Sequence, residues 1–305
     1  MFDVIYIAFI GLGVVVGLFA GLIRVGGGWL LTPTLSLLGF PATQAVGTSL
    51  TQMVGTAVLG ASRHRKHGGI HARIAVAITI PLIVGVHLGR FGLTELTSAG
   101  IADHFIRGAH FLLTIGIGTY MFRETSRAQA EPDGGAARVT WLPQVGPLLR
   151  DRDVTIPVYV PILGGLVAGL LSGIMGIGGG LLLVPIMIYV IGMSVVAAVA
   201  TNLVCIVFGS INGAIGYGLQ GEVDLIGAIA IVTGSYVGSL VGVKLAHRSD
   251  PRKIRRLFSL LMMMMATAII LQFLGLSATV PYLIFIGAAT LSISAIAHAV
   301  GRPEP

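Results

Sequence analysis

Apolar segments separated by short polar stretches extend over most of the 305 residues. Several are about 20 residues long, enough for a helix to cross the hydrocarbon core of a bilayer. Segments 28–39 and 179–191 are too short to cross upright, so the pattern predicts half-helices or arms of re-entrant hairpins there. The other apolar segments are 4–22, 43–61, 71–91, 105–122, 157–174, 195–217, 224–246, 254–274 and 279–300. An all-α integral membrane protein, a polytopic helical bundle, is therefore expected.

One polar stretch, 123–156, divides the chain into two halves. It contains Pro143, Pro147 and the charged run 150–153, a composition typical of a linker and not of a membrane span. We expect an N-terminal membrane repeat over 1–122, a cytoplasmic linker over 123–156 and a C-terminal membrane repeat over 157–305.

The two halves repeat one sequence pattern. Stretch 21–28 reads GLIRVGGG and is followed by Pro33, and stretch 173–180, 152 positions later, reads GIMGIGGG and is followed by Pro185. At an offset of 153, the glycines Gly60, Gly68, Gly85 and Gly89 match Gly213, Gly221, Gly238 and Gly242. Paired, glycine-broken apolar segments in the two halves point to the binding site of a repeat-built transporter.

Composition and charge agree with a membrane protein and suggest its orientation. Hydrophobic residues make up 55% of the chain and charged residues 10%, against about 25% charged in soluble domains. Loop 62–73 carries four Lys or Arg and its counterpart 215–225 none, whereas loop 247–256 carries five and its counterpart 92–104 none. By the positive-inside rule the halves are predicted to be inverted repeats, with the linker and C-terminus cytoplasmic and the N-terminus outside. The start Met-Phe-Asp shows no cleavable signal peptide.

The breaks between apolar segments are the candidate binding site. All 12 carboxylates lie at segment ends or in loops, whereas a cation carrier usually needs an intramembrane carboxylate. Helix N-termini instead favour anions. We therefore expect an anion site at the breaks, where unhindered backbone amides are given by Gly26, Gly27, Gly28, Gly178, Gly179 and Gly180. The alternative is that these glycines serve only tight helix packing.

Neutral polar residues follow each break. Thr48 and Ser49 match Thr201 and Asn202, and Gln52 lies one turn further on. They are predicted to bind the anion through neutral donors or, alternatively, to cap the helices that they begin. Arg24 stands where the second half has a glycine, and it either pairs with the anion, snorkels, or binds loop carbonyls.

The remaining candidates favour structural roles. Cys205 is the single cysteine, which excludes an internal disulfide, and it is expected to be a packed small residue. A hydrogen-bonded structural role is expected for His87 and His110. The cluster His64, His67 and His71 is expected to be a solvated cytoplasmic loop and not a metal site. The methionine run 262–265 is expected to be lipid-facing or packed, and no cofactor is predicted.

These features together resemble the TauE/SafE family of sulfite and sulfonate exporters, also known as the toluene sulfonate uptake permease group. The resemblance rests on 24–28 with Pro33, on 176–180 with Pro185, and on the Thr-Ser and Thr-Asn pairs that follow. It covers nearly the whole chain outside 123–156. It implies an inner-membrane carrier of small sulfur-containing or carboxylate anions, coupled to an ion gradient of H⁺ or Na⁺. Arg24 departs from the family's usual glycine, which puts equal contributions of the two halves in question.

The expected function is export of small sulfur-containing anions such as sulfite or sulfonates. Alternating access would rock one half against the other around a midplane anion site. The alternatives are a passive anion channel lined by the same donors, or a carrier of small carboxylates. An intramembrane serine protease is disfavoured, because the chain lacks G-x-S-x-G and no histidine is evidently placed to activate Ser49 or Ser172. The lipid bilayer is an expected partner and nucleic acid is not.

Overall fold

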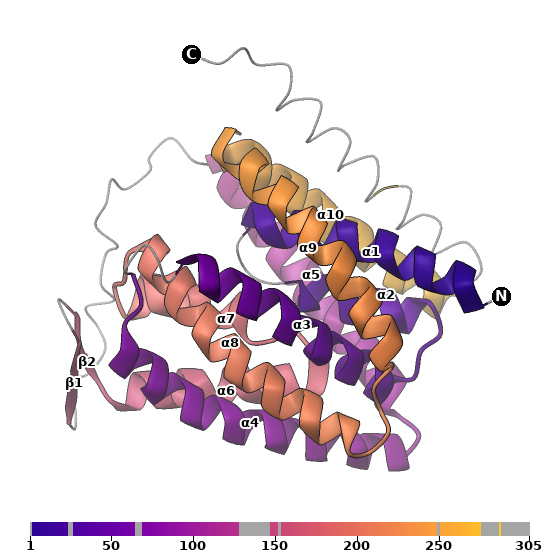
Figure 1. Ribbon diagram of the computed structural model, residues 1–305, viewed down its shortest axis with the longest axis horizontal. Helices are drawn as coiled ribbons and strands as arrows, with labels where there is room; N and C mark the ends of the chain where they lie inside the picture. Colours follow the sequence, from indigo (N-terminus) through magenta and orange to yellow (C-terminus); the bar gives the residue numbers. More distant parts are fainter. Residues whose placement is uncertain are drawn as a thin grey trace.

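The computed structural model describes residues 2–23, 27–64, 69–127, 147–151, 154–248, 251–275 and position 287. This part of the chain forms ten α-helices and one β-hairpin (Figure 1). The helices are α1 (Phe2–Ile23), α2 (Gly28–Leu37), α3 (Ala42–His64), α4 (Ala72–Ser98), α5 (Ala102–Arg127), α6 (Tyr159–Met175), α7 (Gly180–Pro185) with a π-helical turn (Ile186–Val190), α8 (Val195–Gly218), α9 (Leu225–Arg248) and α10 (Pro251–Phe273). The predicted all-α class is confirmed.

Three of the described helices are long and apolar enough to cross a membrane: α4, α8 and the part of α9 from Leu225 to Leu245. Shorter apolar helices cover Tyr6–Leu22 in α1 and Tyr159–Met175 in α6. Many large apolar side chains on the outer faces are exposed, among them Ile80, Leu112 and Ile229. Apolar exteriors of this kind suit contact with lipid.

Helix pairing is exchanged between the two halves. Helix α1 packs along α9, and its counterpart α6 packs along α4. Helix α3 packs against its own counterpart α8, and α5 against its own counterpart α10. Figure 1 shows α1 beside α9 at one side of the bundle and α4 beside α6 at the other. The contacts thus follow the repeat seen in the sequence, while the inversion of the halves across a membrane stays a prediction.

Glycines bring the paired backbones into direct contact. A Cβ atom added at Gly17 of α1 would lie 2.5 Å from the Cα of Ser235 in α9. A Cβ at Gly85 of α4 would lie 2.7 Å from the backbone nitrogen of Leu170 in α6. Small residues allow this close approach of helices. The α1–α9 and α4–α6 pairs, which we call the glycine-packed pairs, therefore join one half of the sequence to the other.

The two short helices agree with the segment lengths. All residues of α2 are buried, and Pro33 lies within it. Helix α7 ends at Pro185, after which the π-helical turn continues to Val190. Short helices were predicted at both positions and are observed there, with α2 wholly buried and α7 partly buried.

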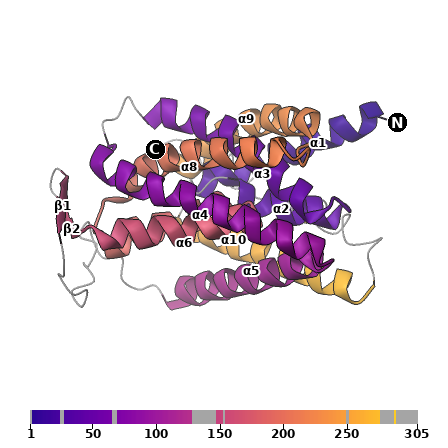
Figure 2. The ribbon, with the colours of Figure 1, turned by 90° about the horizontal axis from the view of Figure 1, so that it is seen from below.

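The stretch predicted as linker also contains regular structure. Helix α5 continues to Arg127, and strands β1 (Leu148–Asp151) and β2 (Val154–Pro157) form an antiparallel hairpin with Asp151 opposite Val154. The hairpin was not predicted. It lies at one end of the bundle in both Figures 1 and 2.

Candidate functional site

The second glycine break has a backbone that only glycine adopts readily. Helix α6 ends at Met175, and the residues after it turn into the left-handed region, with φ of +68° at Gly176, +69° at Gly178 and +71° at Gly179. Side chains with a Cβ are strained there. The motif GIGGG therefore follows from the conformation that connects α6 to α7.

The two breaks meet in the interior. A Cβ atom added at Gly28, the first residue of α2, would lie 2.5 Å from the carbonyl oxygen of Gly176. A Cβ at Gly176 would lie 2.5 Å from the hydroxyl oxygen of Thr32 and 3.4 Å from the Cβ of Ser49. The start of α2, the end of α6 and one face of α3 thus converge. We call this place the break site.

Helices α2 and α7 both begin without a side-chain cap. Their N-cap residues are Gly27 and Gly179, and neither has a side-chain hydrogen bond at the cap. The first backbone N–H groups of a helix have no partner within it, and they carry a partial positive charge. A Cβ at Gly27 would lie 3.7 Å from the Nε2 of Gln52, so that amide approaches the start of α2.

Several neutral polar side chains around the breaks, and Asn202 on α8, are fully buried and have polar atoms without a hydrogen-bond partner. Thr32, Ser49, Gln52 and Asn202 are all inaccessible to solvent. Within the described part of the chain, the hydroxyls of Thr32 and Ser49, the Gln52 oxygen and both polar atoms of Asn202 form no hydrogen bond. The Gln52 nitrogen donates to the Ser235 hydroxyl over 3.1 Å. A buried unpaired polar atom costs about 1–3 kcal/mol, so these atoms are suited to binding a polar ligand.

Thr48 and Thr201 do not cap helices α3 and α8, and their role in binding an anion stays a prediction. Helices α3 and α8 begin at Ala42 and Val195, so both threonines lie in the second turn, and the interpretation as caps of their own helices is wrong. The Thr48 hydroxyl accepts a hydrogen bond from the Asp224 backbone N–H over 3.0 Å. The Thr201 hydroxyl accepts one from the His71 N–H over 3.1 Å. Each threonine thus anchors the start of a long helix of the opposite half.

His71 corrects the expectation of a solvated histidine loop. It is only 5% exposed, it is the N-cap of α4, and its Nδ1 lies 4.0 Å from a carboxylate oxygen of Asp151 in the hairpin. His67 lies outside the described residues, as do two candidate site residues, Arg24 and Gly26. No group of three or more potential metal ligands occurs among the residues that the structure describes.

Other single-residue expectations agree with the structure. Cys205 is buried, with its Sγ 3.7 Å from the Ala75 carbonyl oxygen. The Nδ1 of His110 lies 3.0 Å from the carbonyl oxygen of Ile106, which fits a structural histidine, while His87 is partly exposed. Met262 and Met265 are buried and Met263 is exposed, so the methionine run is partly packed and partly exposed.

Arg90 is a half-buried cation whose contact the sequence reasoning missed. Its Nη1 donates to the Gly216 carbonyl oxygen near the end of α8 over 2.9 Å. A Cβ at Gly216 would lie 2.9 Å from the Arg90 Nε, so the glycine provides the room for the guanidinium. An arginine within an apolar segment was the available signal. The contact ties α4 to the C-terminal carbonyls of α8, which favour a cation.

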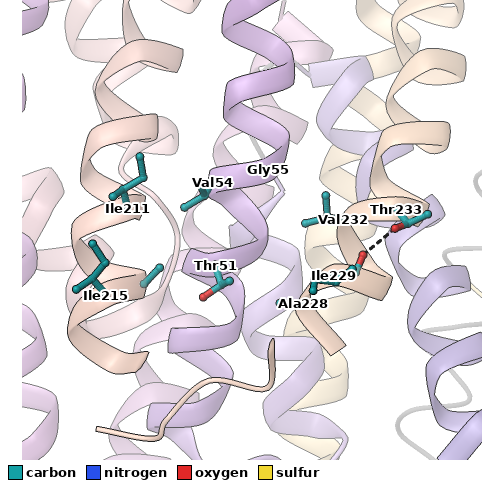
Figure 3. A pocket seen from close by; sticks show the side chains of 10 residues that line it. Thr51, Val54, Gly55, Ile211, Ile215, Ala228, Ile229, Val232 and Thr233 are labelled. Atoms are coloured by element: carbon teal, nitrogen blue, oxygen red, sulfur yellow. Dashed lines mark hydrogen bonds between the residues drawn. The ribbon is translucent and has the colours of Figure 1, made fainter. Parts of the chain in front are cut away.

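A separate cavity of about 360 Å³ lies between α3, α8 and α9 (Figure 3). Its polar lining residues are Thr51 and Thr233, and both hydroxyls already donate to carbonyl oxygens of their own helices, Gly47 and Ile229. The rest of the lining is aliphatic or glycine, and Ile229 in the wall is exposed. The cavity is thus an apolar surface groove whose two lining hydroxyls are already hydrogen-bonded.

Comparisons with known proteins agree with this architecture. A family model described as "Sulfite exporter TauE/SafE" matches residues 9–269. Two relatives come from Bacillus subtilis (strain 168). "Probable membrane transporter protein YdhB" is 27% identical over 76% of this chain and 86% of its own length, and "Probable membrane transporter protein YjnA" is 29% identical over 82% and 93%. A "Probable membrane transporter protein" of Xylella fastidiosa (strain 9a5c) is 29% identical over 86% and 93%. No solved structure matches the chain.

Proposed function

The chain belongs to the TauE/SafE family of membrane transporters, and from this premise we propose that it carries small sulfur-containing anions, such as sulfite or organic sulfonates. The proposed location is the bacterial inner membrane. The observation that supports the proposal most directly is the break site. There, two uncapped helix starts and several buried, unpartnered, neutral side chains converge.

The chemistry of the break site favours an anion over a cation. Its polar side chains from the described part of the chain are hydroxyls and amides, and its backbone contributes N–H groups with partial positive charge. Several such donors bind an oxyanion without the desolvation cost of a buried cation. Arg24 remains a proposed additional contact on sequence grounds, because it lies in the first break.

We propose alternating access in which the moving units differ from those expected from the sequence. The expectation was that one half rocks against the other. The glycine-packed pairs join helices of opposite halves through backbone contacts, so we propose that α1–α9 and α4–α6 move as units. Movement would occur along α3 and α8, where the Leu50 side chain lies against Gly213 and Leu203 lies against Gly60. Side-chain contacts of this kind can shift more readily than interlocked backbones.

Orientation, coupling and direction complete the proposal. The basic loops and the linker would face the cytoplasm and the N-terminus the outside. Coupling to a gradient of H⁺ or Na⁺ would drive net movement, with export as the proposed direction. The full burial of Ser49, Gln52 and Asn202 favours a carrier over an open channel, since a pore-lining side chain would be in contact with water.

Uptake into proteoliposomes tests the proposal. Wild-type protein is expected to take up radiolabelled sulfite saturably, with competition by other sulfur anions and weaker competition by chloride and small carboxylates. Ser49→Ala combined with Asn202→Ala should lower uptake by about tenfold or more, since losing a hydrogen bond to a charged group costs about 1.5–3 kcal/mol. Asn212→Ala is the matched control, because Asn212 is an exposed residue of α8 that donates to the carbonyl of Phe208.

Three outcomes would contradict parts of the proposal. Wild-type uptake by the double variant would remove the break site from the transport path. Uptake that never saturates would indicate a channel. Uptake of small carboxylates but of no sulfur anion, in folded protein, would leave the family and the fold intact while rejecting the substrate class.

A further inference from the structure

The side chain of Met53, on α3, touches both glycine breaks. A Cβ atom added at Gly28, the first residue of α2, would lie 3.3 Å from the Met53 Cγ and closer still to its Sδ. A Cβ added at Gly178, in the turn before α7, would lie 2.6 Å from the same Sδ. Met53 is only 1% exposed. Its thioether therefore fills the space between the two breaks, with glycine backbone on both sides.

Unpaired hydroxyls lie close to this thioether. Ser49 precedes Met53 by one turn, and residues four apart lie on the same face of a helix. The position of a Cβ at Gly176 is 3.4 Å from the Ser49 Cβ and 2.5 Å from the Thr32 hydroxyl oxygen. Neither hydroxyl forms a hydrogen bond within the described part of the chain. A thioether sulfur is only a weak acceptor, so Met53 leaves these groups unsatisfied.

Helix α8 directs a further hydroxyl toward the same level of α3. Ser210 lies four residues after Ile206 and three before Gly213, so the three share one face of α8. Ile206 packs in one cluster with Met53, and the Leu50 side chain of α3 lies against Gly213. Ser210 thus faces α3 between these two contacts. It is 1% exposed, and its hydroxyl has no hydrogen bond among the described residues.

The repeat places Met53 and Ile206 at equivalent positions, 153 residues apart. Both contact the second break, since the Ile206 Cγ2 lies 3.9 Å from the position that a Cβ of Gly178 would occupy. Isoleucine is branched at Cβ and stiff at χ1, whereas methionine is unbranched and adapts to irregular spaces. Of the two equivalent side chains, Met53 is therefore the one that changes its rotamer readily.

From these contacts we propose that an anion binds at the break site by displacing the Met53 thioether, and that Met53 sets the largest anion that the site accepts. The inference rests on the proposed transport of sulfur anions, and it specifies which of them pass. The displaced thioether leaves a space between the start of α2 and the unpaired hydroxyls of Ser49, Thr32 and Ser210. Sulfite and methanesulfonate are close in size to the thioether, whereas an aromatic sulfonate is much larger.

Uptake into proteoliposomes tests the size limit. Initial rates are measured for radiolabelled sulfite and for radiolabelled benzenesulfonate at equal concentrations. Wild-type protein should take up sulfite saturably and benzenesulfonate much more slowly. Met53→Ala removes the thioether and should raise the ratio of benzenesulfonate to sulfite uptake about tenfold, a typical effect of changing the size of a binding pocket. A lost structural contact would lower both rates and leave that ratio unchanged.

Further variants test whether the side chain has to move. Met53→Ile copies the equivalent residue of the second half and should lower sulfite uptake about tenfold, because its branched Cβ restricts χ1. Met53→Leu nearly conserves the volume, so it should give a rate between those of the wild type and Met53→Ile and should fold even if Met53→Ala does not. Met262→Ala and Met262→Ile, at a buried methionine of α10, are the matched controls and should keep the wild-type ratio. Size-exclusion chromatography establishes that each variant is folded.

Nuclear magnetic resonance of the methionine methyl groups tests the displacement without transport. The 10 methionines of the purified protein are labelled at the ε-methyl carbon, and the Met53 signal is the one that Met53→Leu lacks. Titration with sulfite should shift this signal and leave the Met262 signal in place.

Each contrary result has its own meaning. A wild-type uptake ratio in Met53→Ala would overturn the size limit. Wild-type sulfite uptake by Met53→Ile, or a Met53 methyl signal that saturating sulfite leaves unmoved in protein that transports it, would overturn the displacement. Uptake of no sulfur anion by folded wild-type protein would instead reject the proposed function, and a Met53 signal shifted by a small carboxylate would then support displacement by another class of anion.

Discussion

Helices α4 and α9 occupy equivalent places in the two halves, but their N-termini are completed in different ways. In α9, Asp224 precedes the helix and its own carboxylate accepts a hydrogen bond from the Gly227 N–H over 2.9 Å. In α4 the equivalent residue is His71, which makes no side-chain cap. There the carboxylate comes from the hairpin, where Asp151 accepts from the backbone N–H groups of Arg73 over 2.9 Å and Ile74 over 3.3 Å.

The difference shows that the two halves keep a physical requirement while changing the segment that meets it. A carboxylate at a helix N-terminus satisfies free N–H groups and interacts favourably with the helix dipole. The linker hairpin supplies it to α4, and Arg73 in turn donates to the Arg150 carbonyl oxygen over 3.1 Å. The hairpin that connects the two halves is therefore also a structural part of the N-terminal half.

The largest predicted loss of stability concerns the glycine-packed pairs, and it tests whether the two halves are energetically equivalent. Gly85→Leu on α4 and Gly238→Leu on α9 should each destabilise the protein by about 3 kcal/mol or more, because the new side chain meets the backbone of the partner helix. Thermal unfolding in detergent measures the effect. Gly92→Leu, also on α4 but with open space beside it, should be nearly neutral. If only one of the two core variants is destabilised, the exchanged contacts are not energetically equivalent.

A smaller effect tests the two caps. Asp151→Ala and Asp224→Ala should each cost about 1 kcal/mol of stability, the usual value of an N-terminal cap. His71→Asp should restore the stability of Asp151→Ala, because it recreates at α4 the arrangement of α9. Asp151→Asn, which retains the acceptor, should lose less than Asp151→Ala. If His71→Asp does not restore the stability of Asp151→Ala, the hairpin contributes more to α4 than the carboxylate of Asp151.

The smallest effects sharpen the comparison at the threonines. Thr48→Val and Thr201→Val keep the shape of the side chain and remove the acceptor for the N–H of Asp224 or His71. Each should cost about 1–2 kcal/mol, with similar shifts in the unfolding curve. Thr233→Val on the exposed side of α9, whose hydroxyl donates to a carbonyl of its own helix, is the control and should change little. Unequal losses at the two core threonines would show that the anchors differ in strength.

The sequence predicted the features that depend on local pattern. The short helices, the repeat offset and the burial of Cys205 follow from apolar length and glycine position, which are readable without knowing any partner. The sequence shows that Thr48 and Thr201 are equivalent. The backbone N–H groups that donate to their hydroxyls, however, belong to the opposite half. Such pairings depend on the relative placement of distant helices, and a single sequence does not specify it.

Long-range polar contacts were out of reach for the same reason. Asp151 meets Arg73 across 78 positions and Arg90 meets Gly216 across 126. The charged run 150–153 was seen only as linker composition, although one of its carboxylates completes a helix. A half-buried cation at Arg90 could have been suspected from its apolar neighbours, whereas the glycine that accommodates it carries no signal of its own.

The exchange of helix partners also sets an order for synthesis. When α6 enters the membrane its partner α4 is already present, so this pair can form at once. The glycines of α1, by contrast, cannot pack until α9 has been made, and α9 follows the hairpin in the chain. Chains are made from the N-terminus, so the first helix of the nascent protein stays without its partner until nearly the whole chain has been inserted. A product truncated before α9 would carry an uncovered glycine ridge, a surface by which an insertion chaperone or a membrane protease could recognise unfinished molecules.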